Sequence, residues 1–356
     1  MSTLGSILFS GISLYRVTNE ASFMHNSQAR FFGYDLIKTI AISMIVFYHL
    51  GGIDYGAIEP GHFYLPNLNK FFSALCAAGV PLFFMVNGAL VIPKNLHWKQ
   101  LLFKVFHLLF LFVFWKFVLH YLISFKLLAI EDKMVHFWFL CTLSIVYLMS
   151  IVLQKSTFLR HAVLVFLFLF PFCYNFLWNV VLFFAPSFDA CTVVHTGFFT
   201  LYGVLYYYLG GSLGTRHTSS LYAIGLIVFG LLLVNFEVVA MSNHYHAIYD
   251  GVNSTFPTLG ALAMSVGIFI IFKDVSFNDG IARNIVSYVG QNTMGIFLFH
   301  VLVIFLLRQF SPSIFVNLNF WTSLLLSVLI ILCTAFISSL INHSRLAFLL
   351  TLSYKS

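Results

Sequence analysis

Long apolar runs without charge constrain this chain more than any other feature. The segments 219–236 and 320–342 contain no Asp, Glu, Lys or Arg at all. About 20 apolar residues cross the hydrocarbon core of a bilayer as a helix. Across the whole chain, 60% of the residues are hydrophobic and only 8% are charged, whereas a soluble domain carries about 25% charged residues. The polar sequence is too sparse to cover a water-facing surface, so the surrounding solvent is lipid.

Similar apolar runs recur along the chain and predict an all-α, polytopic transmembrane helix bundle of about ten spans. The expected spans are 34–53, 72–92, 101–122, 136–154, 161–183, 198–214, 219–240, 255–272, 287–308 and 320–341. Within them, Gly210 and Gly214 form a pair of small residues four apart, which permits close helix packing. No internal repeat is visible in the sequence.

The positions of Lys and Arg predict the orientation. Most of the 18 basic residues fall into alternate loops, and basic loops stay in the cytoplasm. Both termini are therefore expected there. The same rule accounts for the net charge of +7, so no nucleic-acid partner is predicted. The expected organisation is an N-terminal tail or interfacial segment over 1–29, a transmembrane domain over 30–345 and a cytoplasmic tail over 346–356.

The cysteines and the His-rich outer segment give no metal site. The 5 Cys are scattered and have no CxxC spacing, so neither a disulfide framework nor a zinc site is predicted. His244, His246 and Asp250 include enough ligand types for a metal, but a His-x-His pair in a loop is a common accident. No metal is expected.

Ionisable side chains in the first span carry the chemical signal. Lys38 and His49 are 11 residues apart, which at about 100° per residue places both on one face, about 16 Å apart along the axis. Asp35 stands three residues before Lys38, within pairing range. Charged groups inside a span are costly and indicate function. The alternative is a snorkelling Lys38 and an interfacial His49 at the helix end.

Five segments, in chain order, extend this pattern. They are Lys38 and His49 with ten residues between them, Gly79–Gly88 (GVPLFFMVNG), His136–Leu140 (HFWFL), Tyr208–Gly211 (YLGG) and Thr293–His300 (TMGIFLFH). Together they resemble the acyltransferase-3 family of integral membrane O-acyltransferases. The chain departs from the family pattern at Asn87, where Ser is more usual, and at Phe297, where Tyr is common.

The resemblance implies transfer of an acyl group, most often acetyl from acetyl-CoA, to a hydroxyl of a cell-surface glycan or lipid-linked sugar. His49 is the expected general base, because an imidazole with a pKa near about 6.5 can accept a hydroxyl proton near neutral pH. Asp35 belongs to the same candidate catalytic set, as a partner of Lys38 or Arg30 rather than as a base. Lys38 and Arg30 are the expected ligands of acyl-CoA.

The remaining candidate residues have substrate-contacting or supporting roles. They are Asn87, Lys116, His136, Trp138, Glu237 and His300. Lys116 fits either snorkelling or a phosphate or glycan contact. For Glu237 the sequence favours a helix-end carboxylate near water over a contact with His49 or the acceptor. For His300 it favours a neutral, hydrogen-bonded side chain that packs the bundle over a catalytic role.

The surroundings follow from the same resemblance. The expected location is the bacterial cytoplasmic (inner) membrane, with membrane lipid, acyl-CoA and a glycan acceptor as partners and no permanently bound cofactor. The acceptor, the acyl group, the oligomeric state and the choice between direct transfer and an acyl-histidine are left open. A transporter or flippase for a lipid-linked glycan is the alternative function, and a non-catalytic sensor or scaffold is a third class.

Overall fold

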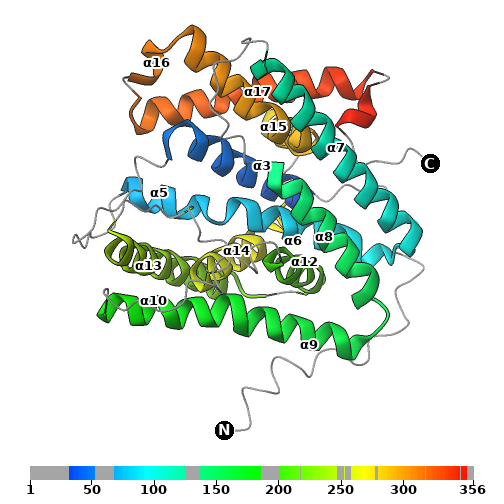
Figure 1. Cartoon of the computed structure of the whole chain (residues 1–356), viewed down its shortest axis with the longest axis vertical. Coiled ribbons are helices and arrows are strands. Elements are labelled where there is room, and N and C mark those ends of the chain that lie inside the picture. The colour runs from blue at the N-terminus through cyan, green and yellow to red at the C-terminus, as the bar shows by residue number, and fades with distance from the viewer. Residues whose placement is uncertain are drawn as a thin grey trace. The chain divides into compact units, whose positions relative to one another are not determined.

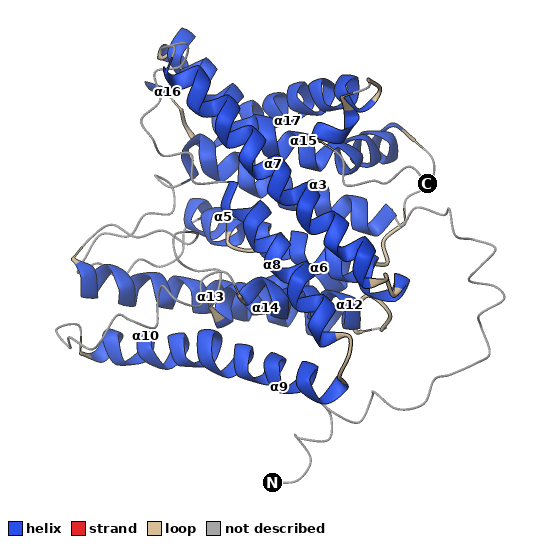
Figure 2. Ribbon diagram, turned by 45° about the vertical axis from the view of Figure 1, so that its right-hand side comes forward, coloured by secondary structure: helices blue, strands red, loops and turns tan. Residues whose placement is uncertain are grey.

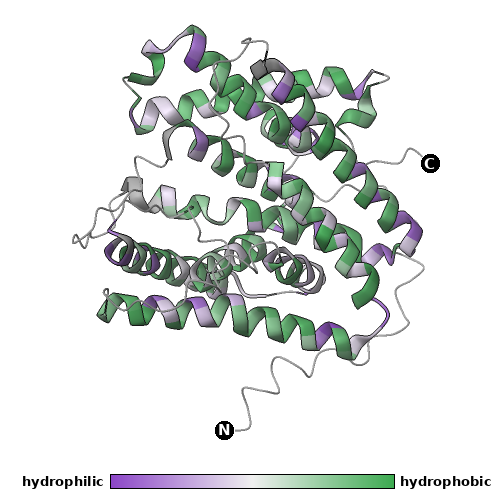
Figure 3. Ribbon diagram, in the orientation of Figure 1, coloured by the Kyte–Doolittle hydropathy of each residue, from purple (hydrophilic) through white to green (hydrophobic). Residues whose placement is uncertain are grey.

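The apolar runs form helices, and the described part of the chain contains no strand (Figure 2). The computed structural model describes residues 32–52, 68–124, 137–185, 201–216, 218–246, 252, 258–276, 280–316, 318–344 and 346–350. The predicted tail over 1–29 lies outside these residues, as does the end of the chain from 351 onward. Hydrophobic residues occupy most of each long helix (Figure 3), as expected for segments in contact with lipid.

Each predicted span has a helical counterpart. The helices are α3 (Phe32–Phe47), η1 (Tyr48–Gly52), α5 (Leu68–Cys76), α6 (Gly79–Val91), η2 (Ile92–Lys94), α7 (Trp98–Ser124), α8 (Trp138–Leu153), α9 (Thr157–Leu167), η4 (Phe168–Tyr174), α10 (Asn175–Phe184), α12 (Tyr202–Leu213), α13 (Ser220–Tyr245), α14 (Leu259–Phe272), α15 (Ile281–Phe310), α16 (Ser313–Val316), α17 (Phe320–Asn342) and η5 (Ala347–Leu349) (Figure 1).

Six helical stretches among the described residues are long and apolar enough to cross a membrane. They are Phe72–Lys94, Trp98–Tyr121, Thr157–Phe184, Ser220–His244, Ile281–Phe310 and Phe320–Asn342, and shorter apolar helices cover Trp138–Leu153 and Leu259–Phe272. The chain is therefore an all-helical protein with several membrane spans. The count of ten and the cytoplasmic termini stay predictions.

Local sequence explains where several helices begin. Ser156 accepts a hydrogen bond from the Leu159 backbone N–H before α9, and Thr258 does the same for Ala261 before α14. Asn319 and Thr322 form a reciprocal capping box at the start of α17. These side chains satisfy backbone donors that the first turn of a helix leaves unpaired.

The first span differs from the uniform α-helix that its sequence predicts. After Phe47 the chain continues as a π-helical turn, Tyr48–Gly52, which contains His49. Such turns insert a wider ring of backbone into a helix and are frequent at functional sites. The wider turn starts one residue before His49, so it changes the predicted angle between Lys38 and His49 only slightly.

Helix α3 lies at the centre of the packing, in contact with α6 and α14 as well as with α15 and α17. Glycines let the backbones approach. A Cβ added at Gly33 would collide with the backbone of Lys273, at the C-terminal end of α14. A Cβ added at Gly210 would collide with the backbone of Met85 in α6. Gly214 faces Ala89 of α6, so the predicted small-residue pair does pack α12 closely on α6.

Candidate active site

Lys38 is held between its own helix and α15. Its Nζ lies 2.8 Å from Asp35 Oδ1, so the predicted pairing is present. The same Nζ donates to the Gly290 carbonyl at 2.6 Å. The Asp35 side chain is 3% exposed and that of Lys38 is 18% exposed. The carboxylate is thus buried, while the ammonium keeps partial access to the outside of the bundle.

His49 also faces α15. Its imidazole stacks on that of His300, with ring centroids 5.2 Å apart and planes inclined by 9°. His300 is fully buried and His49 is half-buried. The imidazole of His49 therefore packs against the buried ring of a neighbouring helix.

These contacts confirm that Lys38 and His49 share one face of the first span. Lys38 meets Gly290 and His49 meets His300, so the contact points advance in the same direction along both helices. α3 and α15 therefore run parallel. The first and ninth of a series of alternating spans would also run parallel, which agrees with the predicted order of crossings.

The ring of His300 is locked to the backbone of α15. Its Nδ1 lies 3.0 Å from the Ile296 carbonyl and 2.9 Å from the Phe297 carbonyl. Because a carbonyl only accepts, Nδ1 carries the proton and donates to both oxygens. In the neutral ring, Nε2 is then the acceptor. The predicted hydrogen-bonded, buried His300 is present, and it lies directly against His49.

Ring contacts connect four of the five motif segments, and a close backbone contact adds the fifth. Phe297 lies 6.0 Å from His300 and 5.2 Å from Phe139, measured between ring centroids, and Phe139 lies 5.0 Å from Phe84. The fifth segment, Tyr208–Gly211, packs by its backbone, because a Cβ added at Gly210 would collide with the backbone of Met85 in the Gly79–Gly88 segment. Segments that are far apart in the sequence thus form one continuous core around α3.

Asn87 is bound by protein groups on both ends of its amide. Nδ2 donates to the Phe83 carbonyl at 3.0 Å, and the Tyr147 hydroxyl donates to Oδ1 at 3.0 Å. This arrangement joins α6 to α8. Asn87, which departs from the family pattern, is therefore a link between helices.

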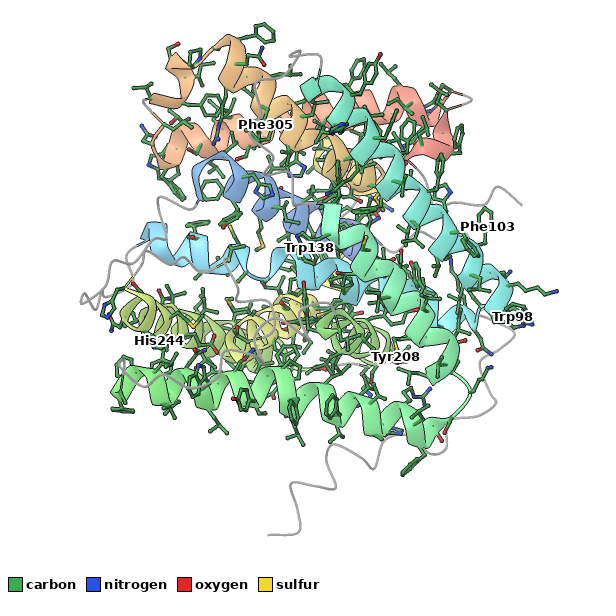
Figure 4. All side chains as sticks on the ribbon, viewed as in Figure 1. Trp98, Phe103, Trp138, Tyr208, His244 and Phe305 are labelled. Carbon is green, nitrogen blue, oxygen red and sulfur yellow. The ribbon has the colours of Figure 1, made fainter. Side chains whose placement is uncertain are left out.

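Trp138 and Lys116 flank the core. Trp138 begins α8 (Figure 4), half-buried, with its ring 6.4 Å from that of Tyr202. Lys116 is exposed on α7, and its Nζ lies 5.7 Å from the ring centroid of Phe112. Both the snorkelling role and the ligand contact stay compatible with this position.

The structure corrects the expectation for Glu237. The sequence favoured a carboxylate near water at a helix end, but Glu237 is 1% exposed, and α13 continues eight residues further, to Tyr245. Its carboxylate lies near the Thr258 hydroxyl and the Gly260 N–H, at the first turn of α14, but neither oxygen forms a hydrogen bond of ordinary geometry with the described residues. The partner helix explains the difference, because its unpaired backbone donors attract a carboxylate.

Some predicted residues lie outside the described part of the chain. Arg30 and His136 are among them, as is Asp250. In the part that the structure covers, no group of three or more His, Cys, Asp and Glu side chains could hold a metal ion.

One residue of the site was missed by sequence reasoning. Gly290 supplies the carbonyl for Lys38 and the space for Asp35, and its signal is a glycine in an apolar helix ten residues before His300.

The family comparison settles what kind of protein has this arrangement. The sequence matches the acyltransferase-3 family model, described as an acyltransferase domain, over residues 31–343. The chain belongs to the acyltransferase-3 family. No curated protein and no solved structure matches it. As an acyltransferase-3 protein it is a multi-pass membrane protein of an acyltransferase family, and the matched region includes all five motif segments.

Proposed function

We propose that this protein transfers an acyl group, with acetyl as the expected group, from acyl-CoA to a hydroxyl of a cell-surface glycan or lipid-linked sugar in the bacterial inner membrane. The observation that supports this most is the alignment of Lys38 and His49 along α15. A cation and an imidazole, about 16 Å apart on one helix face, match the two ends of an acyl-CoA, its phosphates and its thioester.

His49 is the general base in this proposal. Its imidazole takes the proton of the acceptor hydroxyl while the oxygen attacks the thioester carbonyl. The C–S bond then breaks, the CoA thiolate leaves, and the proton on His49 passes to that thiolate. Reactants and products balance, and no cofactor or metal is required. The half-buried position of His49 leaves one side of the ring for substrate while the other rests on His300.

Lys38 is the anion ligand, together with Arg30. Phosphate oxygens form strong, charge-assisted hydrogen bonds with ammonium groups. Asp35 holds Lys38 in place beside the Gly290 carbonyl. In this role Asp35 acts as the partner of the cation and takes no part in proton transfer.

The test uses membranes of cells that express the chain, incubated with radiolabelled acetyl-CoA. We expect label in the glycan or lipid-linked sugar fraction, and its loss in His49→Ala at equal expression. His161→Ala is the control, because the hydrogen bond between His161 Nδ1 and the Thr157 carbonyl lies at the exposed surface of α9. Movement of a lipid-linked glycan across the membrane without acyl-CoA, unchanged in His49→Ala, would instead identify a flippase.

A further inference from the structure

The two stacked imidazoles lie in different environments, and the proposed function gives a role only to His49. His49 is half-buried and stands in the wider π-helical turn, whereas His300 is fully buried in the middle of a regular α-helix. Only His49 has access to the outside of the bundle. A buried ring lying parallel to a more accessible one is suited to hold it.

The contacts of His300 make its ring a rigid support. Nδ1–H donates to the carbonyls of Ile296 and Phe297, and Phe297 packs beside the ring with a centroid distance of 6.0 Å. The backbone of α15 therefore sets the plane of the ring. The ring of His49 lies parallel to that of His300 within 9°, so the ring of His300 limits how far the ring of His49 can tilt.

We propose that His300 is a positioning residue for acyl transfer: its ring face, stacked on the imidazole of His49, keeps that imidazole in the orientation from which it accepts the hydroxyl proton. This inference rests on the proposed function, in which His49 is the base. The support is geometric and acts through the ring face, so a ring without nitrogen should preserve much of it.

Asn side chains elsewhere in the chain show which substitutions at His300 would keep its hydrogen bond. Asn87, Asn235 and Asn292 each donate from Nδ2 to the carbonyl four residues back in their helices. His300→Asn therefore keeps the donor to Ile296 and removes the ring face. His300→Phe keeps a ring face of similar size and removes the donor. The two variants separate the two contributions.

The experiment measures kcat and the KM for acetyl-CoA with purified protein and a membrane extract as acceptor source. For His300→Asn we expect kcat to fall about tenfold to a hundredfold, the range that misplacing a reacting group by about 1 Å produces, with KM unchanged. For His300→Phe we expect kcat within about threefold of the unmodified protein, because the stacked arrangement survives. His343→Asn and His343→Phe are the controls, since His343 is exposed at the C-terminal end of α17 and bonds the Ser339 carbonyl.

Each other result overturns the inference in a defined way. If His300→Phe is as inactive as His300→Asn, the ring face alone does not position His49, and the inference fails. If both variants keep kcat per folded molecule and only lower the yield, His300 merely packs the core. Should His49→Ala itself retain transfer, the proposed function fails, and that outcome is distinct from both of the others.

Discussion

Asp35 and Gly290 lie in such close contact that a Cβ added to the glycine would be 2.7 Å from the Asp35 Cβ. This contact seats α3 against α15 and leaves the Gly290 carbonyl beside the ammonium of Lys38. Any side chain at 290 has to move Asp35, and Asp35 holds Lys38. The spacing of the two helices and the position of the cation are therefore coupled.

Gly290→Ala tests this coupling. Overpacking costs about 1–3 kcal/mol, so we expect a lower free energy of unfolding together with weaker acyl-CoA binding. Thermal unfolding in detergent and acyl-CoA titration measure the two effects. Gly225→Ala is the matched control, because a Cβ at Gly225 meets nothing within 4 Å. If Gly290→Ala behaves like the control, the close approach has no consequence for the site.

Removal of Lys38 should have two effects that a second substitution separates. Lys38→Met leaves the buried Asp35 carboxylate without its cation, and breaking a buried pair costs about 3–5 kcal/mol. We expect lower stability and a higher KM for acyl-CoA. Adding Asp35→Asn should restore stability but leave KM high, because the anion ligand is still absent.

The double variant also gives the contradicting result. If Lys38→Met with Asp35→Asn recovers both stability and KM, Lys38 is a structural ion pair and some other cation binds the donor. Unfolding in detergent and initial rates at varied acyl-CoA distinguish the two cases.

Tyr147→Phe tests whether Asn87 links helices or contacts substrate. The change removes the donor to Asn87 Oδ1 and should cost about 1–3 kcal/mol, because a partly buried acceptor loses its partner. We expect a lower unfolding temperature with kcat and KM unchanged. Tyr222→Phe on the exposed face of α13 is the control. A change in KM without a change in stability would point to a substrate contact.

Glu237 should tolerate Gln but not Leu. Gln keeps the size of the side chain and a polar group beside the Gly260 N–H and the Thr258 hydroxyl, the two groups near the carboxylate. Leu places an apolar group beside these donors at the first turn of α14, at a cost of about 1–3 kcal/mol. Unfolding temperatures measure this difference. Loss of transfer in well-folded Glu237→Gln would show that the charge itself serves the reaction.

The sequence predicted the part of the site that depends on one helix alone. Helix periodicity fixes the faces of Lys38 and His49 whatever surrounds them, and both residues do face α15. Apolar runs of sufficient length likewise located the helices. Which helix would pack against the face that carries Lys38 and His49 depends on tertiary packing, so the stacking of His300 on His49 was not predicted.

The remaining differences have the same physical origin. The sequence predicted that Glu237 lies near water, because its own helix was expected to end close to it. In the structure the carboxylate lies beside the first turn of α14. The π-helical turn at Tyr48–Gly52 depends on how the end of the first span packs, and periodicity alone does not show it. Local pattern therefore determined faces and spans, while the partners of polar side chains came from the assembled bundle.

The most direct test of the central claim compares two quantities in the same preparation of His49→Ala: bound acetyl-CoA and acetyl groups transferred. Without a general base the hydroxyl keeps its proton, whereas Lys38 and the donor site are intact. We predict unchanged binding of acetyl-CoA and a loss of transfer of about a hundredfold or more. Transfer by His49→Ala at the rate of the unmodified protein would contradict the account.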